Sequence, residues 1–171
     1  MYKLLFLLLL ISQTACSQNS NKANTKNNTM SKNIYYSTTN KEKVVVPDSV
    51  WKQILSPEVY AVARQKGTER PFTSIFETSK EVGTYHCVAC GNPLFKSDTK
   101  FDSGCGWPSF FDPITKGAII YTPDNTHGMT RTEVQCGKCK GHLGHVFFGE
   151  RFTEKDTRHC VNSISMKFVK D

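Results

Sequence analysis

Two short stretches of the chain constrain how it can fold: Cys87-Val88-Ala89-Cys90-Gly91-Asn92 and Cys136-Gly137-Lys138-Cys139-Lys140-Gly141. Each stretch holds two cysteines with two residues between them, and 45 residues separate the pairs. Such a turn lets two thiolates converge on one ion about 2.3 Å away, and nearby glycines permit its tight backbone. We therefore expect one zinc ion bound by Cys87, Cys90, Cys136 and Cys139. All four positions of a tetrahedron would be filled, so this zinc would be structural.

Three other arrangements of these cysteines compete with the zinc site. One pair could be a thioredoxin-type redox motif, although no βαβ pattern surrounds either pair. Both pairs could be disulfides, as in an exported protein. The second pair, Cys136 and Cys139, could also bind an ion locally with His142 and His145. Four ligands within ten residues would be crowded, and the first pair would then have no role, so the sequence favours a site made by all four cysteines.

The first 16 residues are typical of an export signal. Lys3 precedes an unbroken apolar run over residues 4–11, which is too short to span a bilayer as a helix. Ala15 and Cys16 then end the segment in a way that resembles a bacterial lipoprotein signal, with Cys16 as the lipidated residue. The sequence thus predicts an exported protein, periplasmic or anchored in the outer membrane, that contacts the membrane only through a lipid. The alternative is ordinary cleavage and release as a soluble secreted protein.

Residues 17–43 have the composition of a disordered tether. Of these 27 residues, 20 are Asn, Ser, Thr or Lys and five are apolar, so little surface could be buried to offset the entropy of ordering. The folded domain is therefore expected over residues 44–171, which is long enough for one core.

The formal net charge of +7 does not indicate a nucleic-acid partner. Five of the lysines lie within residues 17–43, and four zinc-bound thiolates with one Zn²⁺ would add a net charge of −2 to the domain. A nucleic-acid interface shows Lys and Arg clustered on one element, and the sequence has no such cluster. We expect no nucleic-acid ligand.

Helical periodicity is confined to the start of the domain. Apolar residues recur at i, i+3 and i+4 over residues 50–55, a short helix that Asp48 or Ser49 would cap. A second helix is expected to begin after Ser56 as its N-cap and to end at Gly67.

After residue 70 the pattern predicts β-strands, at residues 83–88, 117–121, 130–136, 144–148 and 158–169. The last of these alternates well, and one face would carry Arg158, Cys160, Asn162, Ile164, Met166 and Phe168. The predicted fold class is therefore mainly β, a small domain of antiparallel sheets with short N-terminal helices that the four-cysteine zinc site staples together.

Cys105 stands apart from the paired cysteines. Gly104 and Gly106 flank it, which indicates an exposed turn with an accessible sulfur, and the ring of Trp107 offers an apolar platform beside it. The alternative, a small buried thiol beside a core tryptophan, fits the flanking glycines less well.

Cys160 lies in the last predicted strand, and Arg158 and Asn162 share its face. A cationic neighbour such as Arg158 lowers the pKa of a thiol and raises the fraction of thiolate. His142 and His145 supply two imidazoles that can hydrogen-bond an oxygen and move protons. The two single cysteines therefore look like a nucleophile and its resolving partner.

Together these residues resemble a known family, the B-type peptide-methionine sulfoxide reductases (MsrB). The resemblance covers residues 50–168 and rests on the paired cysteines and on four further motifs in order: Lys66-Gly67-Thr68-Glu69 followed by Pro71-Phe72, Ser103-Gly104-Cys105-Gly106-Trp107-Pro108-Ser109-Phe110, Gly141-His142-Leu143-Gly144-His145-Val146-Phe147, and Arg158-His159-Cys160-Val161-Asn162-Ser163. It implies a barrel-like fold of twisted antiparallel sheets, with the zinc remote from catalysis.

The resemblance also implies a role for each site residue. Cys160 would be the catalytic nucleophile, assisted by Arg158, and Cys105 the resolving cysteine. Trp107 would receive the S-methyl group of the substrate, while the sulfoxide oxygen would be bound and polarised by His142, His145 and Asn162. Glu150 stands near the position at which many members of the family carry an acidic or amide residue, and is a candidate helper.

The reaction so implied is the reduction of methionine-R-sulfoxide in oxidised proteins, with a thioredoxin-like dithiol as the electron donor. We expect a monomer. Two alternatives from other classes are a zinc-ribbon binding module and a disulfide-stapled extracellular domain without metal. Neither of these two alternatives explains why Cys105 and Cys160 each lie in a distinct motif outside the cysteine pairs.

Overall fold

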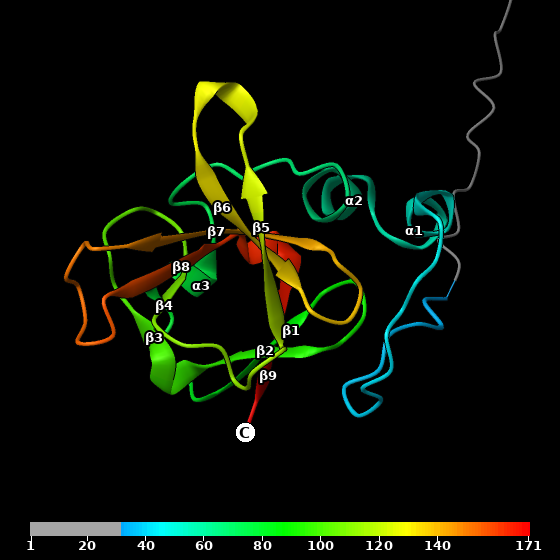
Figure 1. The fold of residues 1–171 in the computed structure, drawn as a ribbon. Coiled ribbons are helices and arrows are strands. Elements are labelled where there is room, and N and C mark those ends of the chain that lie inside the picture. Colours follow the sequence, from blue (N-terminus) through cyan, green and yellow to red (C-terminus); the bar gives the residue numbers. More distant parts are fainter. Residues whose placement is uncertain (1–31) are drawn as a thin grey trace, which may run out of the picture.

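The computed structural model describes residues 32–171. The elements at the start of the domain are α1 (Asp48–Ile54) and α2 (Pro57–Ala63), which are labelled in Figure 1. As predicted, Ser56 caps α2, since its hydroxyl accepts a hydrogen bond from the backbone N–H of Val59 at 3.3 Å. The end predicted for α2 at Gly67 is wrong by one turn, because the helix ends at Ala63.

The cap predicted for the first helix is also wrong. α1 already begins at Asp48, and Pro47 occupies the N-cap position without a side-chain hydrogen bond. Asp48 instead lies in the first turn, where an acidic side chain interacts favourably with the helix dipole.

A third helix, α3 (Ile75–Thr78), was not expected from the sequence. It is a single turn, which is too short to display a helical period. The hydroxyl of Ser74 caps it by accepting from the N–H of Phe76, and the ring of Phe76 packs edge-on against Tyr85 at 5.5 Å. A local cap and an aromatic contact therefore hold this turn.

The strands of the described chain form two antiparallel sheets. The three-stranded sheet has the order β2-β1-β9, and the six-stranded sheet has the order β3-β4-β8-β7-β6-β5. The strands are β1 (Gly83–Cys87), β2 (Pro93–Lys96), β3 (Lys100–Phe101), β4 (Ser109–Phe110), β5 (Ile119–Asp124), β6 (Arg131–Cys136), β7 (His142–Phe148), β8 (Thr157–Val161) and β9 (Met166–Lys170), with short 3₁₀ turns η1 (Ser97–Thr99), η2 (Thr126–Gly128) and η3 (Ser163–Ser165). In Figure 1 the β5–β6 hairpin, in yellow, projects from the body of the domain.

The strand predicted over residues 158–169 is wrong as a single element. It is two strands, β8 in the larger sheet and β9 in the smaller one, and η3 separates them. Three consecutive residues, Val161, Asn162 and Ser163, are all buried, so the alternation of one face with the other breaks there. Three strands, β2 to β4, were not predicted, because runs of two to four residues are too short to show a period.

Aromatic side chains fill the core. Tyr85, Phe95 and Phe110 are fully buried, and the rings of Phe95 and Phe110 stack with their centroids 4.4 Å apart. The four cysteines of the paired motifs belong to the same buried cluster. The predicted fold class, a mainly β domain of antiparallel sheets with short helices and a four-cysteine site, is confirmed.

The end of the predicted tether is not free. Asn33 Nδ2 donates to the carbonyl of Ala89 at 2.8 Å, and the N–H of Ser37 donates to the carbonyl of Cys90 at 3.1 Å. The buried ammonium of Lys138 donates to the carbonyls of Ser37 and Asn40, at 3.1 and 2.7 Å. Composition alone does not predict that these residues are ordered. A buried ammonium needs hydrogen-bond acceptors, and here the fold places backbone carbonyls of residues 37 and 40 beside it.

We call residues 33–44, which pack on the cysteine motifs, the N-terminal strap; its last residue, Val44, donates its N–H to the carbonyl of Lys138. The predicted signal, Cys16 and the rest of the tether lie outside the described residues. Within residues 32–171, no helix has the length and apolar character needed to cross a membrane.

Candidate active site

The four paired cysteines converge at a junction between the two sheets. Cys87 ends β1 of the smaller sheet and Cys136 ends β6 of the larger one. The four buried sulfurs lie within 4.8 Å of one another, with 3.7 Å between Cys87 and Cys139 and 3.6 Å between Cys90 and Cys136.

These distances fit a metal ion. A tetrahedron of sulfurs about 2.3 Å from zinc has edges of about 3.8 Å, which is close to both sulfur–sulfur distances. All four residues are free cysteines, so the disulfide alternative is not found. The predicted zinc ligands Cys87, Cys90, Cys136 and Cys139 are confirmed as one buried site, and because all four positions are filled by sulfur the zinc is structural.

The two single cysteines meet on the larger sheet. Cys105 Sγ lies 3.7 Å from Cys160 Sγ, although 55 positions separate them in the chain. Cys160 sits in β8, where it pairs with Ser109 of β4 and with His145 of β7. Cys105 lies in the loop before β4, between two glycines that adopt φ of +67° and +86°. The chain bends here as the flanking glycines predict, but the Cys105 side chain is half-buried and not fully exposed.

The two thiols influence each other's pKa. The contact with Cys160 lowers the pKa of the Cys105 thiol to about 4, against the effect of burial, and the hydroxyls of Ser103 and Ser109 lower it further. The same contact, with burial second, raises the pKa of Cys160 above its ordinary value, while Arg158 opposes that rise. One negative charge is therefore distributed over the pair, and both the serine hydroxyls and the guanidinium stabilise it.

Arg158 is held beside this charge by Glu150. The guanidinium donates from Nε and Nη2 to the two carboxylate oxygens of Glu150, at 2.7 and 2.9 Å, and stacks over the ring of Phe147 at 4.4 Å. The bond to Glu150 raises the pKa of Arg158 and lowers that of Glu150, so both stay ionised. Glu150 thus acts on the thiol pair through Arg158.

A cavity of about 150 Å³ opens next to Cys160. Apolar and polar groups from separate segments line it: Thr68, Trp107, Arg131, Gly144, His145, Phe147, Cys160, Val161 and Asn162. Four of the residues that the sequence singled out, Cys160, Trp107, His145 and Asn162, therefore line one hollow. His142 is not part of this lining.

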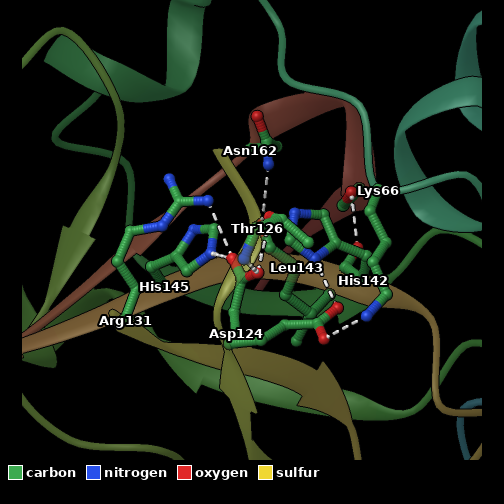
Figure 2. Close-up of polar contacts among 10 residues, drawn as sticks. Lys66, Asp124, Thr126, Arg131, His142, Leu143, His145 and Asn162 are labelled. Atoms are coloured by element: carbon green, nitrogen blue, oxygen red, sulfur yellow. Dashed lines mark hydrogen bonds and ion pairs between the residues drawn. The ribbon is translucent and has the colours of Figure 1, made fainter. Parts of the chain in front are cut away.

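Each histidine of the predicted pair is tied to a carboxylate, and each carboxylate to a cation (Figure 2). His145 Nε2 lies 2.7 Å from Asp124 Oδ2, which also accepts from Arg131 Nη2 at 2.7 Å. Hydrogen bonds from Thr126, with those from His145 and Arg131, hold the pKa of Asp124 well below its ordinary value. The His145 ring is thereby fixed at the edge of the cavity.

The second histidine is deeper. His142 Nδ1 lies 2.7 Å from Glu133 Oε1, and Lys66 Nζ donates to Glu133 Oε2 at 2.8 Å. Burial lowers the pKa of His142, against the opposing effect of Glu133. The rings of His142 and His145 meet edge to face at 5.6 Å. The alternative metal site that would join both imidazoles to the second cysteine pair is not formed, because Cys136 and Cys139 cluster with Cys87 and Cys90 instead.

Asp124, Glu133 and Arg131 were missed at the sequence level. Glu133 is 1% exposed, and a buried carboxylate needs a partner. The sequence does show a carboxylate, Glu133, next to the apolar Val134 within a predicted strand. It does not show which of the distant cations and imidazoles is the partner of that carboxylate. The pairing depends on the register of β6 with β7.

The fold and the site define a class: a thiol-based redox enzyme whose sheets are clipped by a structural metal. Two thiols in contact beside a cavity can exchange between a dithiol and a disulfide, and the buried four-cysteine site leaves no position open for chemistry. Comparison with known proteins agrees with this class, since the SelR domain model matches residues 55–170.

Relatives of this chain identify the family. The peptide methionine sulfoxide reductase MsrB of Pseudomonas putida is 54% identical over 118 residues, which are 69% of this chain and 88% of that protein. The MsrB of Agrobacterium fabrum is 52% identical over 126 residues (74% and 93%), and that of Leptospira interrogans is 52% identical over 125 residues (72% and 94%). The chain therefore belongs to the MsrB family of peptide methionine sulfoxide reductases.

Proposed function

We propose that the Cys105–Cys160 pair is the site at which this chain reduces methionine-R-sulfoxide in proteins to methionine. The observation that carries the proposal is the distance of 3.7 Å between the two sulfurs, next to a cavity with both apolar and hydrogen-bonding walls. A protein-bound methionine sulfoxide likewise has a methyl group and a polar oxygen. The R epimer comes from membership of the family.

Cys160 passes its proton to Cys105, 3.7 Å away, and attacks the sulfoxide sulfur as the thiolate. The oxygen passes to Cys160, methionine leaves, and Cys160 becomes a sulfenic acid, so that sulfoxide plus thiol gives thioether plus sulfenic acid. Cys105 then attacks the sulfenic sulfur, and water leaves as the disulfide forms. An external dithiol reduces this disulfide by exchange.

A sulfoxide oxygen must be protonated or strongly hydrogen-bonded before its sulfur is attacked. His145 is the better candidate for this role, because it lines the cavity and stands opposite Cys160 in the β7–β8 register. His142 supports the ring of His145 edge to face, with Glu133 behind it. Asn162 would bind the same oxygen, and Trp107 would contact the S-methyl group.

A pair of variants tests the assignment of the two cysteines. With a methionine-R-sulfoxide peptide and no reductant, Cys160→Ser should release no methionine, whereas Cys105→Ser should still release one equivalent per protein. With a thioredoxin system, Cys105→Ser should lose recycling. Full recycling by Cys105→Ser would eliminate the resolving role, and turnover by Cys160→Ser would eliminate the mechanism.

We also propose that the chain is exported, is anchored through a lipid on Cys16, acts as a monomer and receives electrons from a thioredoxin-like donor outside the cytosol. What supports export is the apolar run at residues 4–11 before Cys16. Labelling of cells with a radioactive fatty acid should mark the wild-type chain and leave Cys16→Ser unlabelled. Equal labelling, or none in either chain, would contradict the anchor.

A further inference from the structure

Glu69, in the segment between α2 and α3, makes four hydrogen bonds around the cavity. It is not part of the cavity lining itself, and the mechanism above gives it no role. Its carboxylate bonds to the start of η3, whereas its backbone bonds to Asn162 and Trp107.

The carboxylate of Glu69 accepts two hydrogen bonds. Oε1 accepts from the backbone N–H of Ser163 at 2.5 Å, and Oε2 accepts from the N–H of Ile164 at 3.0 Å. These two N–H groups open the η3 turn, where a helical turn supplies no acceptor of its own. Bonds from a carboxylate to backbone N–H groups are among the stronger hydrogen bonds in proteins, so they hold residue 69 against the end of β8.

The backbone of Glu69 in turn holds two residues of the cavity. Its N–H donates to Asn162 Oδ1 at 3.1 Å, and its carbonyl accepts from the indole Nε1 of Trp107 at 3.2 Å. Asn162 Nδ2 donates to the carbonyl of Leu143 at 3.1 Å. With Oδ1 and one hydrogen of Nδ2 so engaged, the amide has one orientation, and its second Nδ2 hydrogen can serve an oxygen in the cavity.

We infer that Glu69 is a positioning residue of this site: its carboxylate anchors a backbone that sets both the Asn162 amide, which binds the sulfoxide oxygen, and the Trp107 ring, which contacts the methyl group. The inference rests on the proposed function for the roles of those two residues. It couples the polar and the apolar contacts of the substrate through one side chain. Displacing either group by about 1 Å is enough to cost about 100-fold in rate.

Two substitutions distinguish the loss of both hydrogen-bond acceptors of Glu69 from the loss of its negative charge. Glu69→Ala removes both acceptors and should lower kcat/KM for a methionine-R-sulfoxide peptide about 100-fold. Glu69→Gln keeps one oxygen acceptor but turns an amide NH₂ toward the other N–H, so a loss of about 10-fold is expected, mainly as a higher KM. The matched control is Glu81→Gln, because the carboxylate of Glu81 forms an exposed ion pair with Lys170. It should retain wild-type values.

The second readout does not depend on turnover. The indole N–H signals of Trp107 and Trp51 are distinguished in a proton–nitrogen NMR spectrum by comparison with Trp107→Phe. In Glu69→Ala the Trp107 signal should move and its hydrogen exchange should accelerate, with a smaller change in Glu69→Gln. The Trp51 signal, from a fully buried ring in the core, should not move.

A third readout tests whether the effect of Glu69 is confined to the reaction with the sulfoxide. Reduction of the Cys105–Cys160 disulfide by dithiothreitol does not use the sulfoxide-binding groups, so its rate should be the same in Glu69→Gln and wild type. The inference is overturned if kcat/KM is unchanged, if the Trp107 signal is unchanged while kcat/KM falls, or if both indole signals move together, since the last would indicate a general loss of packing. Absence of turnover in the wild type would instead overturn the proposed function, while the NMR result would still decide the anchoring of Trp107.

Discussion

Gly144 allows β7 and β8 to approach closely at the nucleophile, and its replacement should displace Cys160. A Cβ atom at position 144 would lie 2.0 Å from the carbonyl oxygen of Cys160 and 3.1 Å from Cα of Val161. All of these atoms belong to backbone, so no side chain can rotate away. The strands would have to separate by about 1 Å or more before the contact became tolerable, since favourable contacts between heavy atoms begin at about 3.5 Å.

The consequence for catalysis follows from the register. His145 stands directly opposite Cys160, so a separation of the strands changes the position of the sulfur relative to the imidazole and the cavity. A misplacement of about 1 Å costs about 100-fold in rate, and overpacking of this kind costs about 1–3 kcal/mol of stability. Gly144→Ala should therefore lower the single-turnover rate about 100-fold and lower the midpoint of urea unfolding.

The assay is methionine released per protein in rapid mixing with a methionine-R-sulfoxide peptide in the absence of reductant. Gly117→Ala is the control, because Gly117 adopts φ of +85° and no atom lies within 4 Å of the position that a Cβ would take, in a loop outside the cavity. It should lose about 1–2 kcal/mol of stability from the left-handed backbone and keep the rate. A wild-type single-turnover rate in Gly144→Ala would show that the close approach of β7 and β8 does not position Cys160.

Three further predictions concern stability. Cys136→Ser should contain less than one zinc per protein by elemental analysis. Its free energy of unfolding should be several kcal/mol lower than that of wild type, because metal binding contributes directly to folding. Full zinc content in this variant would contradict the four-cysteine site. Burial lowers the pKa of His142 and His159, so as the pH falls the unfolded chain binds protons at a higher pH than the folded chain does. The stability that these two neutral imidazoles contribute is complete above about pH 6.5 and is lost as the pH falls below it. The urea midpoint should therefore be lower at about pH 5.5 than at about pH 7.5, and a higher midpoint at the lower pH would contradict the prediction. Removal of residues 1–43 takes two carbonyl partners from the buried Lys138 ammonium and should lower the free energy of unfolding by about 1–3 kcal/mol. Lys138→Met in the shortened chain should recover part of that loss. An unchanged urea midpoint after the deletion would show that the contacts of residues 33–43 do not stabilise the domain.

Much of the site could be predicted before the fold was known. The zinc ligands follow from spacing, because a C-x-x-C turn constrains two sulfurs locally. Cys105, Cys160, Trp107 and Asn162 follow from motifs, and the structure brings all four together. The supporting residues could not be predicted, because Glu69 acts on Asn162 across 93 positions of the chain and Lys66 on Glu133 across 67.

The break in the last predicted strand has the same cause. Period-two alternation is a local property, and it continues through residues 158–169 whether or not the backbone does. The turn at η3 is stabilised by the carboxylate of Glu69, and no pattern within residues 158–169 reports that distant partner.

The residues that carry the chemistry are recognisable without a structure: four cysteines at metal spacing, two single cysteines in motifs of their own, and the two histidines His142 and His145. How these residues act depends on contacts that form in the folded chain. The tertiary structure places the two single sulfurs 3.7 Å apart, puts His145 at the cavity and His142 behind it, and packs residues 33–44 on the metal site. The physical reason is that residue identity and spacing constrain bonds within a turn, whereas the pairing of groups from different strands depends on register and on which buried charges must be satisfied.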